Sequence, residues 1–120
     1  MPVAFSVVET DSDLIVYSAI DEKPKTVSDP HALARVRDVR ARPTVSLLVD
    51  EWHEDWSRLG WLRLDGNATL LEPNGETTDE HAAAVKALRG RYPQYTAHRL
   101  EERPVLRIQI KRVTGWSAAL

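Results

Sequence analysis

Alternating and continuous apolar runs, separated by polar turn residues, predict five β-strands along this chain. Residues 4–9 (AFSVVE) and 14–19 (LIVYSA) flank the polar turn TDSD, so they are expected to pair as a hairpin. Three apolar side chains of the first strand are expected in the core: Phe5, Val7 and Val8. The remaining strands are expected at residues 44–50, 59–71 and 105–114.

Each of the three later strands has a pattern of its own. Residues 44–50 (TVSLLVD) are apolar on both faces, which indicates a strand in the centre of the sheet. In the next strand, Gly66 predicts a bulge or a bend. Alternation in the last strand places one set of side chains inward (Leu106, Ile108 and Ile110) and the other outward (Arg107, Gln109 and Lys111).

A first helix is predicted between the second and third strands. Asp29 is suited to cap its start, Pro30 suits its first position, and Pro43 disfavours helix at the residue before it. Three apolar residues at helical spacing are expected to share its inner face: Ala32, Val36 and Val39.

A second helix is predicted to open at a capping box, because Glu80 follows Thr77 by three residues, and to end at Gly90. Helices do not alternate with every strand, so a doubly wound parallel fold is disfavoured. We therefore expect a mainly β domain with two helices, whose largely antiparallel sheet curls into a barrel. Apolar faces left over from an incomplete barrel favour a homodimer.

Composition and charge narrow the class of protein. At 120 residues, the chain fits one domain, 1–120. It has no cysteine, which excludes disulfide scaffolds, thiolate zinc sites and thiol nucleophiles. Its 16 basic and 18 acidic residues give a net charge of −2, so general binding to nucleic acid is not expected. No membrane helix or signal peptide is recognisable, and a cytoplasmic location is expected.

Local clusters of cations are the first candidate for chemistry. Lys23 and Lys25 flank Pro24, which stiffens the loop that follows the second strand. Together with Arg35 in the helix, they are suited to hold a phosphate. The alternative is a solvated, charged turn.

The order of these segments resembles the split β-barrel family of pyridoxamine-phosphate-oxidase-like proteins. The resemblance rests on a strand, a basic loop (DEKPK), a helix, the strand RPTVSLLVD and the strand WLRLDGNATLL. Together with the loop EWHEDWS, these segments are most similar to the actinobacterial branch that uses coenzyme F420. The resemblance implies an FMN-binding-like split barrel, a homodimer, and F420 or FMN as cofactor. Relatives carry a further helix and strand before the segment that matches Pro2 to Val8, so both are expected to be missing here.

The resemblance also implies a set of cofactor-binding residues. Relatives lay the tricyclic ring of the cofactor against the strand end that corresponds to Tyr17, Ser18, Ala19 and Ile20. A basic residue at the position of Arg35 contacts the phosphate in the family, and Trp61 lies where the second subunit supplies a contact to the ring. Each of these residues has a structural alternative, because small residues can pack inside a strand and a tryptophan can fill a core or an interface.

The other candidate residues give weaker indications of a binding or catalytic role. Trp56, in a polar loop, is suited to a pocket wall or a subunit contact. No metal site is predicted, because adjacent ligands in one loop rarely converge on an ion. The four histidines are expected at the surface: His31, His53, His81 and His98. No catalytic side chain is identified, which is compatible with a cofactor that performs the chemistry.

The leading interpretation is therefore an oxidoreductase that transfers hydride between F420 or FMN and a small unsaturated or nitrogenous substrate. Two alternatives remain open at this point. One is a binding or storage protein for the cofactor that performs no turnover. The other is a truncated, inactive homologue.

Overall fold

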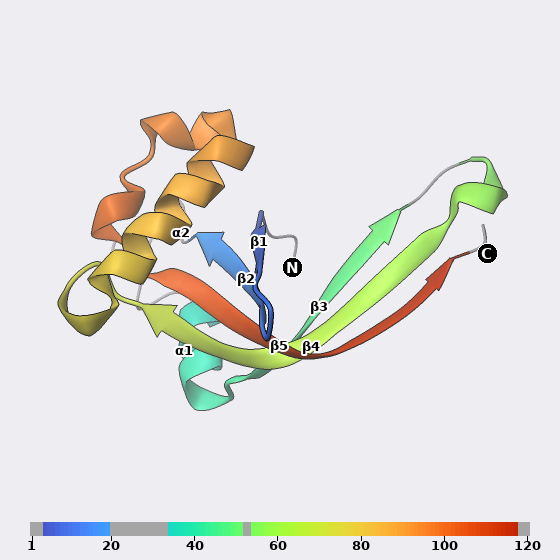
Figure 1. Ribbon diagram of the computed structural model, residues 1–120, viewed down its shortest axis with the longest axis horizontal. Helices are drawn as coiled ribbons and strands as arrows, with labels where there is room; N and C mark the ends of the chain where they lie inside the picture. Colours follow the sequence, from blue (N-terminus) through green and yellow to red (C-terminus); the bar gives the residue numbers. More distant parts are fainter. Residues whose placement is uncertain (1–3, 20–33, 52–53, 118–120) are drawn as a thin grey trace.

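The computed structural model describes residues 4–19, 34–51 and 54–117, which form one antiparallel sheet with a helix on each face (Figure 1). Across the sheet the strands follow the order β1 (Ser6–Glu9), β2 (Leu14–Ala19), β5 (Val105–Ser117), β4 (Gly60–Leu71) and β3 (Thr44–Glu51). The helices are α1 (Ala34–Ala41) and α2 (Thr78–Arg91). The predicted class, mainly β with two helices, is confirmed, and the open sheet is that of a split barrel.

The sheet divides into a body and an arm (Figure 1). In the body, α1 and α2 pack on opposite faces of the sheet. The arm consists of residues 46–51, 60–65 and 112–117, where β3, β4 and β5 continue beyond both helices. None of the helices in the described residues is long and apolar enough to cross a membrane.

Two apolar clusters hold the body together, one on each face of the sheet. On the first face, Ile15, Tyr17 and Ala19 of β2 pack with three side chains of α2: Ala84, Val85 and Leu88. On the other face, Val16, Leu106 and Ile108 pack with Val36 and Val39 of α1. The predicted inner face of the first helix is thus confirmed at Val36 and Val39, whereas Ala32, Asp29 and Pro30 lie outside the described residues.

Gly66 lies at the junction between the body and the arm. Asp65 pairs with Arg112 and Gly66 pairs with Ile110, so one extra residue of β5 is accommodated between the two pairs. A Cβ atom at Gly66 would lie 2.2 Å from the carbonyl oxygen of Gln109. The predicted bulge is confirmed, and the close approach of the two backbones explains why glycine occupies the position.

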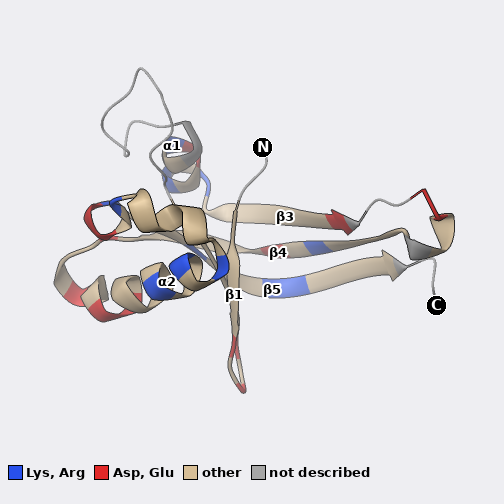
Figure 2. Cartoon of the chain, turned by 90° about the horizontal axis from the view of Figure 1, so that it is seen from above, with Lys and Arg blue, Asp and Glu red and all other residues tan. Residues whose placement is uncertain are grey.

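The sequence prediction was wrong about the position of one strand and about the burial of two side chains on another. β3 is not central but lies at an edge, paired only with β4 within the described sheet. On one of its faces only Leu48 is apolar, and this residue lies on the arm, beyond the helices, where it is 64% exposed. β1 forms the other edge, and its hairpin with β2 extends away from the helices (Figure 2). Val7 and Val8, expected in the core, are therefore exposed.

The expected ends of α2 also differ from the structure. The Thr77 hydroxyl donates to the carbonyl of Glu72 rather than capping the helix, and the Glu80 side chain binds Tyr17 instead of closing a capping box. The helix continues through Gly90, whose φ is not positive, and ends at Arg91. A tertiary contact to the sheet thus replaces a local cap.

Two polar side chains lie deeper than expected. Arg107 alternates with the apolar residues of β5 as predicted, but α2 covers its face, and its guanidinium donates to Glu80. His81, expected at the surface, is 3% exposed because it lies on the inner side of α2. Its Nε2 lies 2.6 Å from the carbonyl oxygen of Arg103, which requires Nε2 to carry the proton.

Candidate cofactor-binding site

A cavity of about 490 Å³ opens on one face of the arm. It is lined by residues from all three arm strands and by the residue before β4: Leu48, Asp50, Leu59, Gly60, Trp61, Arg63 and Trp116. We call it the arm groove. Its size lies within the range of small-molecule sites, about 300–1,000 Å³.

Strand alternation and register bring the two indoles of the arm groove together. Trp61 of β4 lies directly opposite Trp116 of β5, and Asp50 of β3 is the partner of Trp61 on its other side. Directly opposed side chains share one face of a sheet and lie about 5 Å apart. The floor of the groove is therefore a pair of neighbouring tryptophans with a carboxylate at one edge.

A short hydrogen-bond chain fixes Arg63, the cation among the described residues that line the arm groove. The Nε atom of Arg63 donates to Oδ1 of Asp65 over 2.9 Å, and the hydroxyl of Ser46 donates to the same oxygen over 2.5 Å. The hydrogen bond from Ser46 and then that from Arg63 lower the pKa of Asp65 below its ordinary value. Asp65 thus remains ionised and orients the guanidinium, whose outer edge is exposed.

The end of β2, where a ring was expected, is committed to contacts within the chain. The Tyr17 hydroxyl donates to Oε2 of Glu80 over 2.7 Å, and Nε of Arg107 donates to the same oxygen over 2.7 Å. The Ser18 hydroxyl donates to the carbonyl of Ala4 over 2.9 Å, and Ala19 is buried. These side chains tie β2 to α2 and to the chain before β1.

Burial and hydrogen bonding determine the charge states of Tyr17 and Glu80, which meet Arg107 at the end of β2. Burial, and then the hydrogen bond to Glu80, raise the pKa of Tyr17 to about 12. Burial alone would raise the pKa of Glu80, but the hydrogen bonds from Tyr17 and Arg107 outweigh it and hold that pKa below its ordinary value. At neutral pH the tyrosine is protonated and the carboxylate is ionised.

The remaining predicted site residues fall into two groups: some lie outside the described residues, and Trp56 is described but exposed. Ile20, Lys23 and Lys25 lie outside the described residues, and so does the side chain of Arg35, which belongs to α1. Trp56 lies in a short 3-10 helix, Trp56–Arg58, which Asp55 caps, and its side chain is 74% exposed. It does not line the arm groove, whereas Trp61 does.

Tyr17 and Trp61 lie near opposite ends of the sheet. Tyr17 pairs with Arg107 of β5, whereas Trp61 pairs with Trp116 of the same strand. Nine residues of β-strand span about 30 Å. One chain therefore does not bring the end of β2 and the arm groove to the same small molecule.

Of the residues that line the arm groove, sequence reasoning had identified only Trp61 as a site residue, and it missed the aromatic and cationic groups of Trp116 and Arg63. The predicted last strand stopped at residue 114, although Trp116 continues the alternation of Arg112 and Thr114 on one face. Extending that alternation across the glycine at 115 is the signal that would have found it.

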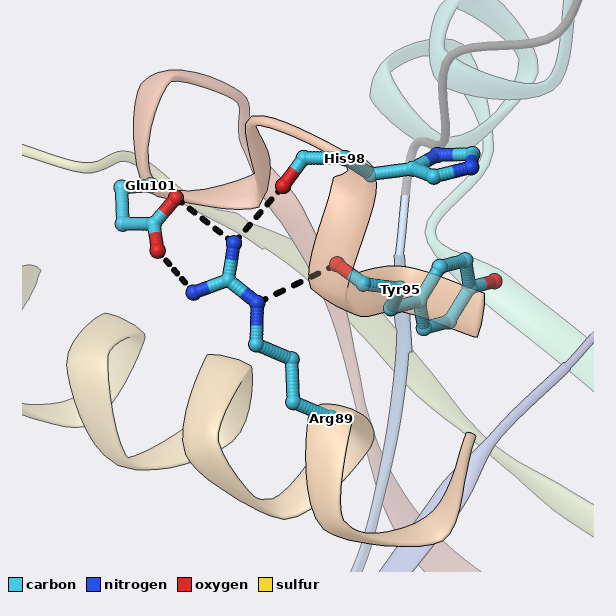
Figure 3. Close-up of polar contacts among 4 residues, drawn as sticks. All are labelled: Arg89, Tyr95, His98 and Glu101. Atoms are coloured by element: carbon cyan, nitrogen blue, oxygen red, sulfur yellow. Dashed lines mark hydrogen bonds and ion pairs between the residues drawn. The ribbon is translucent and has the colours of Figure 1, made fainter. Parts of the chain in front are cut away.

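Another polar network, around Arg89, lies on the body and involves none of the residues that line the arm groove (Figure 3). The guanidinium of Arg89 binds the carboxylate of Glu101 and donates to the carbonyls of Tyr95 (3.2 Å) and His98 (2.7 Å). The hydrogen bond from Arg89 lowers the pKa of Glu101 to about 2. This network fastens the segment after α2 to the helix, and it is a structural contact.

The open antiparallel sheet, its helix on each face and its projecting arm define a split β-barrel domain. A profile of the family described as Pyridoxamine 5'-phosphate oxidase matches residues 2–117. The chain belongs to this family, which confirms the resemblance seen in the sequence. A search of curated proteins found no match.

Two solved structures share the fold. The conserved hypothetical protein Rv2991 from Mycobacterium tuberculosis superposes with a TM-score of 0.64 at 15% identity, over 95% of this chain and 65% of that one. A FAD-binding protein from Mesorhizobium loti superposes with a TM-score of 0.52 at 20% identity, over 92% of this chain and 70% of that one. The chain thus spans just under two thirds of the length of the Mycobacterium protein.

Proposed function

We propose that the chain forms a homodimer that binds F420 or FMN between its subunits and transfers hydride to a small unsaturated or nitrogenous acceptor. The observation that carries the proposal is the separation of the arm groove from the end of β2. Both are expected to border the cofactor ring, yet they lie about 30 Å apart along β5. Two chains, each offering its arm to the strand end of the other, satisfy both expectations.

The exposed apolar surface of the arm supports assembly with a second copy. Leu48, Leu62, Val113 and Trp116 are 46–64% exposed, and they lie on both faces of the arm. Large exposed apolar patches mark interaction surfaces in soluble proteins. The unpaired edge of β3 adds a row of backbone groups that favours association.

The residues of the arm groove fit a planar ring. Two neighbouring indoles provide a stacking surface, and Leu48 and Leu59 provide apolar walls that exclude water. The predicted phosphate contacts fall to Lys23, Lys25 and Arg35. The bound cofactor would supply the hydride chemistry, while the chain orients its ring and shields it.

Family membership and the name of the Mesorhizobium loti protein support a flavin-type ring. The loop sequences DEKPK and EWHEDWS favour F420 over FMN, because they resemble the branch that uses F420. Both cofactors combine a tricyclic ring with a phosphate. A direct comparison of their affinities therefore decides between them.

The test is titration of the purified protein with F420 and, separately, with FMN, while sedimentation measures its mass. We expect saturable quenching of cofactor fluorescence and the mass of a dimer. Trp61→Ala should weaken binding about fivefold, since a ring stacked on an aromatic side chain gains of the order of 1 kcal/mol. The matched control is Val8→Ala, an exposed apolar residue on β1 away from the arm. If neither cofactor binds, the proposal is wrong.

A second experiment separates an enzyme from a protein that only binds the cofactor. The bound cofactor is reduced by a partner enzyme, and its reoxidation is followed with candidate acceptors. Acceleration by an acceptor over the protein-free rate supports turnover. Binding without acceleration across unsaturated and nitrogenous acceptors assigns the chain to binding or storage.

A further inference from the structure

We infer that the arm groove is built for a planar, conjugated ring that carries a negative charge, and that Arg63 determines this preference. The inference deepens the proposed function and rests on it for the identity of the ring. It adds one requirement, namely an anionic group on the ring system. Neither the fold nor the family membership implies this requirement. It rests on the floor of the arm groove, the fixed guanidinium and the distribution of charge around them.

The floor of the arm groove selects a flat ligand. Trp61 and Trp116 are opposed across β4 and β5, so both side chains belong to one face of the sheet, and both line the groove. They remain 38% and 50% exposed although they are among the largest apolar side chains of the domain. A conjugated ring that lies over both indoles removes more apolar surface from water than a compact ligand of equal volume.

Arg63 lies one step along the same face, two residues from Trp61, at a spacing of about 7 Å. Its Nε is bound to Asp65, and Ser46 holds the same carboxylate oxygen from β3. A guanidinium anchored through Nε keeps its two terminal nitrogens as a fork, the geometry that binds carboxylate, sulfonate or phosphate oxygens in pairs. Orientation by Asp65 means that less side-chain entropy is lost when an anion binds.

Charge around the arm groove is asymmetric. Asp50 is the cross-strand partner of Trp61, and Arg63 lies one step further along the same face of β4, diagonal to Asp50. An anionic group is therefore attracted to the Arg63 end and repelled from the Asp50 end. The groove should orient a ring with its charged edge toward Arg63 and a neutral or hydrogen-bond-donating edge toward Asp50.

A second copy of the chain is the competing occupant, because an apolar arm also favours self-association. The charged groups of the groove make a second copy an unfavourable occupant of the groove floor. A subunit contact over this floor would bury the Asp50 carboxylate and the two terminal nitrogens of Arg63, for which the described residues show no hydrogen bond, and burying such groups without a partner is costly. A small anion satisfies Arg63 and leaves Asp50 at the rim in water.

The experiment uses two fluorescent probes of similar size with the full chain. One is anionic, 8-anilinonaphthalene-1-sulfonate, and the other is neutral, N-phenyl-1-naphthylamine. We expect Arg63→Met to weaken the anionic probe about tenfold, the value of one charge-assisted hydrogen bond pair at an exposed site, and to leave the neutral probe within twofold. Asp50→Asn should strengthen the anionic probe two- to threefold.

The matched control is Arg112→Met, since Arg112 is an exposed cation on the same face of β5 that does not line the groove. Circular dichroism confirms that each variant is folded. If Arg112→Met weakens the anionic probe as much as Arg63→Met, or if Arg63→Met weakens both probes equally, the inference is wrong. Probe affinity that falls as the chain concentration rises would show that a second copy covers the groove, and would also overturn it.

Competition identifies the source of the anionic ring. Displacement of the anionic probe by F420 or FMN assigns the groove to the cofactor, and retention of the probe beside bound cofactor assigns it to the acceptor. The proposed function fails separately, if neither cofactor binds. In that case an Arg63-dependent preference for the anionic probe still supports the inference.

Discussion

The glycine at the junction of body and arm allows a sharp test of the fold. Replacing Gly66 by alanine places a Cβ atom 2.2 Å from the carbonyl oxygen of Gln109 and 3.0 Å from the Cα of Ile110. All of the clashing atoms belong to the backbone of β5, so no side chain can rotate away. Strands β4 and β5 must separate by about 1 Å or more to restore an ordinary contact.

The size of the effect follows from that geometry. Overpacking in a well-packed interior costs about 1–3 kcal/mol, and backbone clashes lie at the upper end because ladder hydrogen bonds lengthen as well. We therefore expect Gly66→Ala to lower the free energy of unfolding by about 3 kcal/mol. For a domain of this size the midpoint of thermal unfolding should fall by about 12 °C.

The same substitution at Gly90 is the matched control. Gly90 lies within α2, and a Cβ atom there would meet no heavy atom within 4 Å. Gly90→Ala should stabilise the protein by about 0.5–1 kcal/mol, because alanine loses less backbone freedom in a helix. Urea and thermal denaturation at one fixed protein concentration measure both variants. Equal stabilities for the two variants, or a Gly66→Ala protein as stable as the parent, would refute the register assigned to β4 and β5.

Three further predictions concern other contacts. Tyr17→Phe should lower the free energy of unfolding by about 1.5 kcal/mol, because it removes a hydrogen bond to the ionised Glu80. Denaturant titration measures this change, and an unchanged midpoint would contradict the contact. The folded-state pKa of Glu101, about 2, lies below its ordinary 4.5, so the stability it adds is complete above pH 4.5 and is lost as the pH falls through 2. Glu101→Gln should therefore lose less stability than the parent between pH 5 and pH 2 in urea titrations, and parallel curves would argue against the ion pair. Lys23→Ala combined with Lys25→Ala should weaken cofactor binding without changing the unfolding midpoint, and unchanged affinity would remove these lysines from the site.

The regular part of the fold was accessible from sequence because its signals are local. β2 was predicted with its observed bounds, and the bulge at Gly66 was anticipated from a glycine inside a strand pattern. The apolar face of the first helix was read from the spacing of Val36 and Val39. In each case the residues themselves, rather than distant partners, set the conformation.

The errors have a common physical cause, which is the identity of a distant partner. The apolar run of β3 suggested a central strand, but only the partner strands decide its position, and on the face opposite Val45, Leu47 and Val49 only Leu48 is apolar. Thr77 and Glu80 have the spacing of a capping box, but Tyr17 and Arg107 offer Glu80 hydrogen bonds from the sheet. The alternation of the last strand could have been extended to Trp116, but its pairing with Trp61 depends on the register between β4 and β5, which no local pattern encodes.

The strand order has a consequence for how the protein is made. β5 lies between β2 and β4, yet it follows both of them in the sequence. While the chain emerges from the ribosome, the two hairpins that precede β5 have no shared neighbour and cannot join into one sheet. Assembly of the sheet therefore waits for β5 to leave the exit tunnel, and premature termination between Leu71 and Val105 leaves two disconnected hairpins for proteases and chaperones.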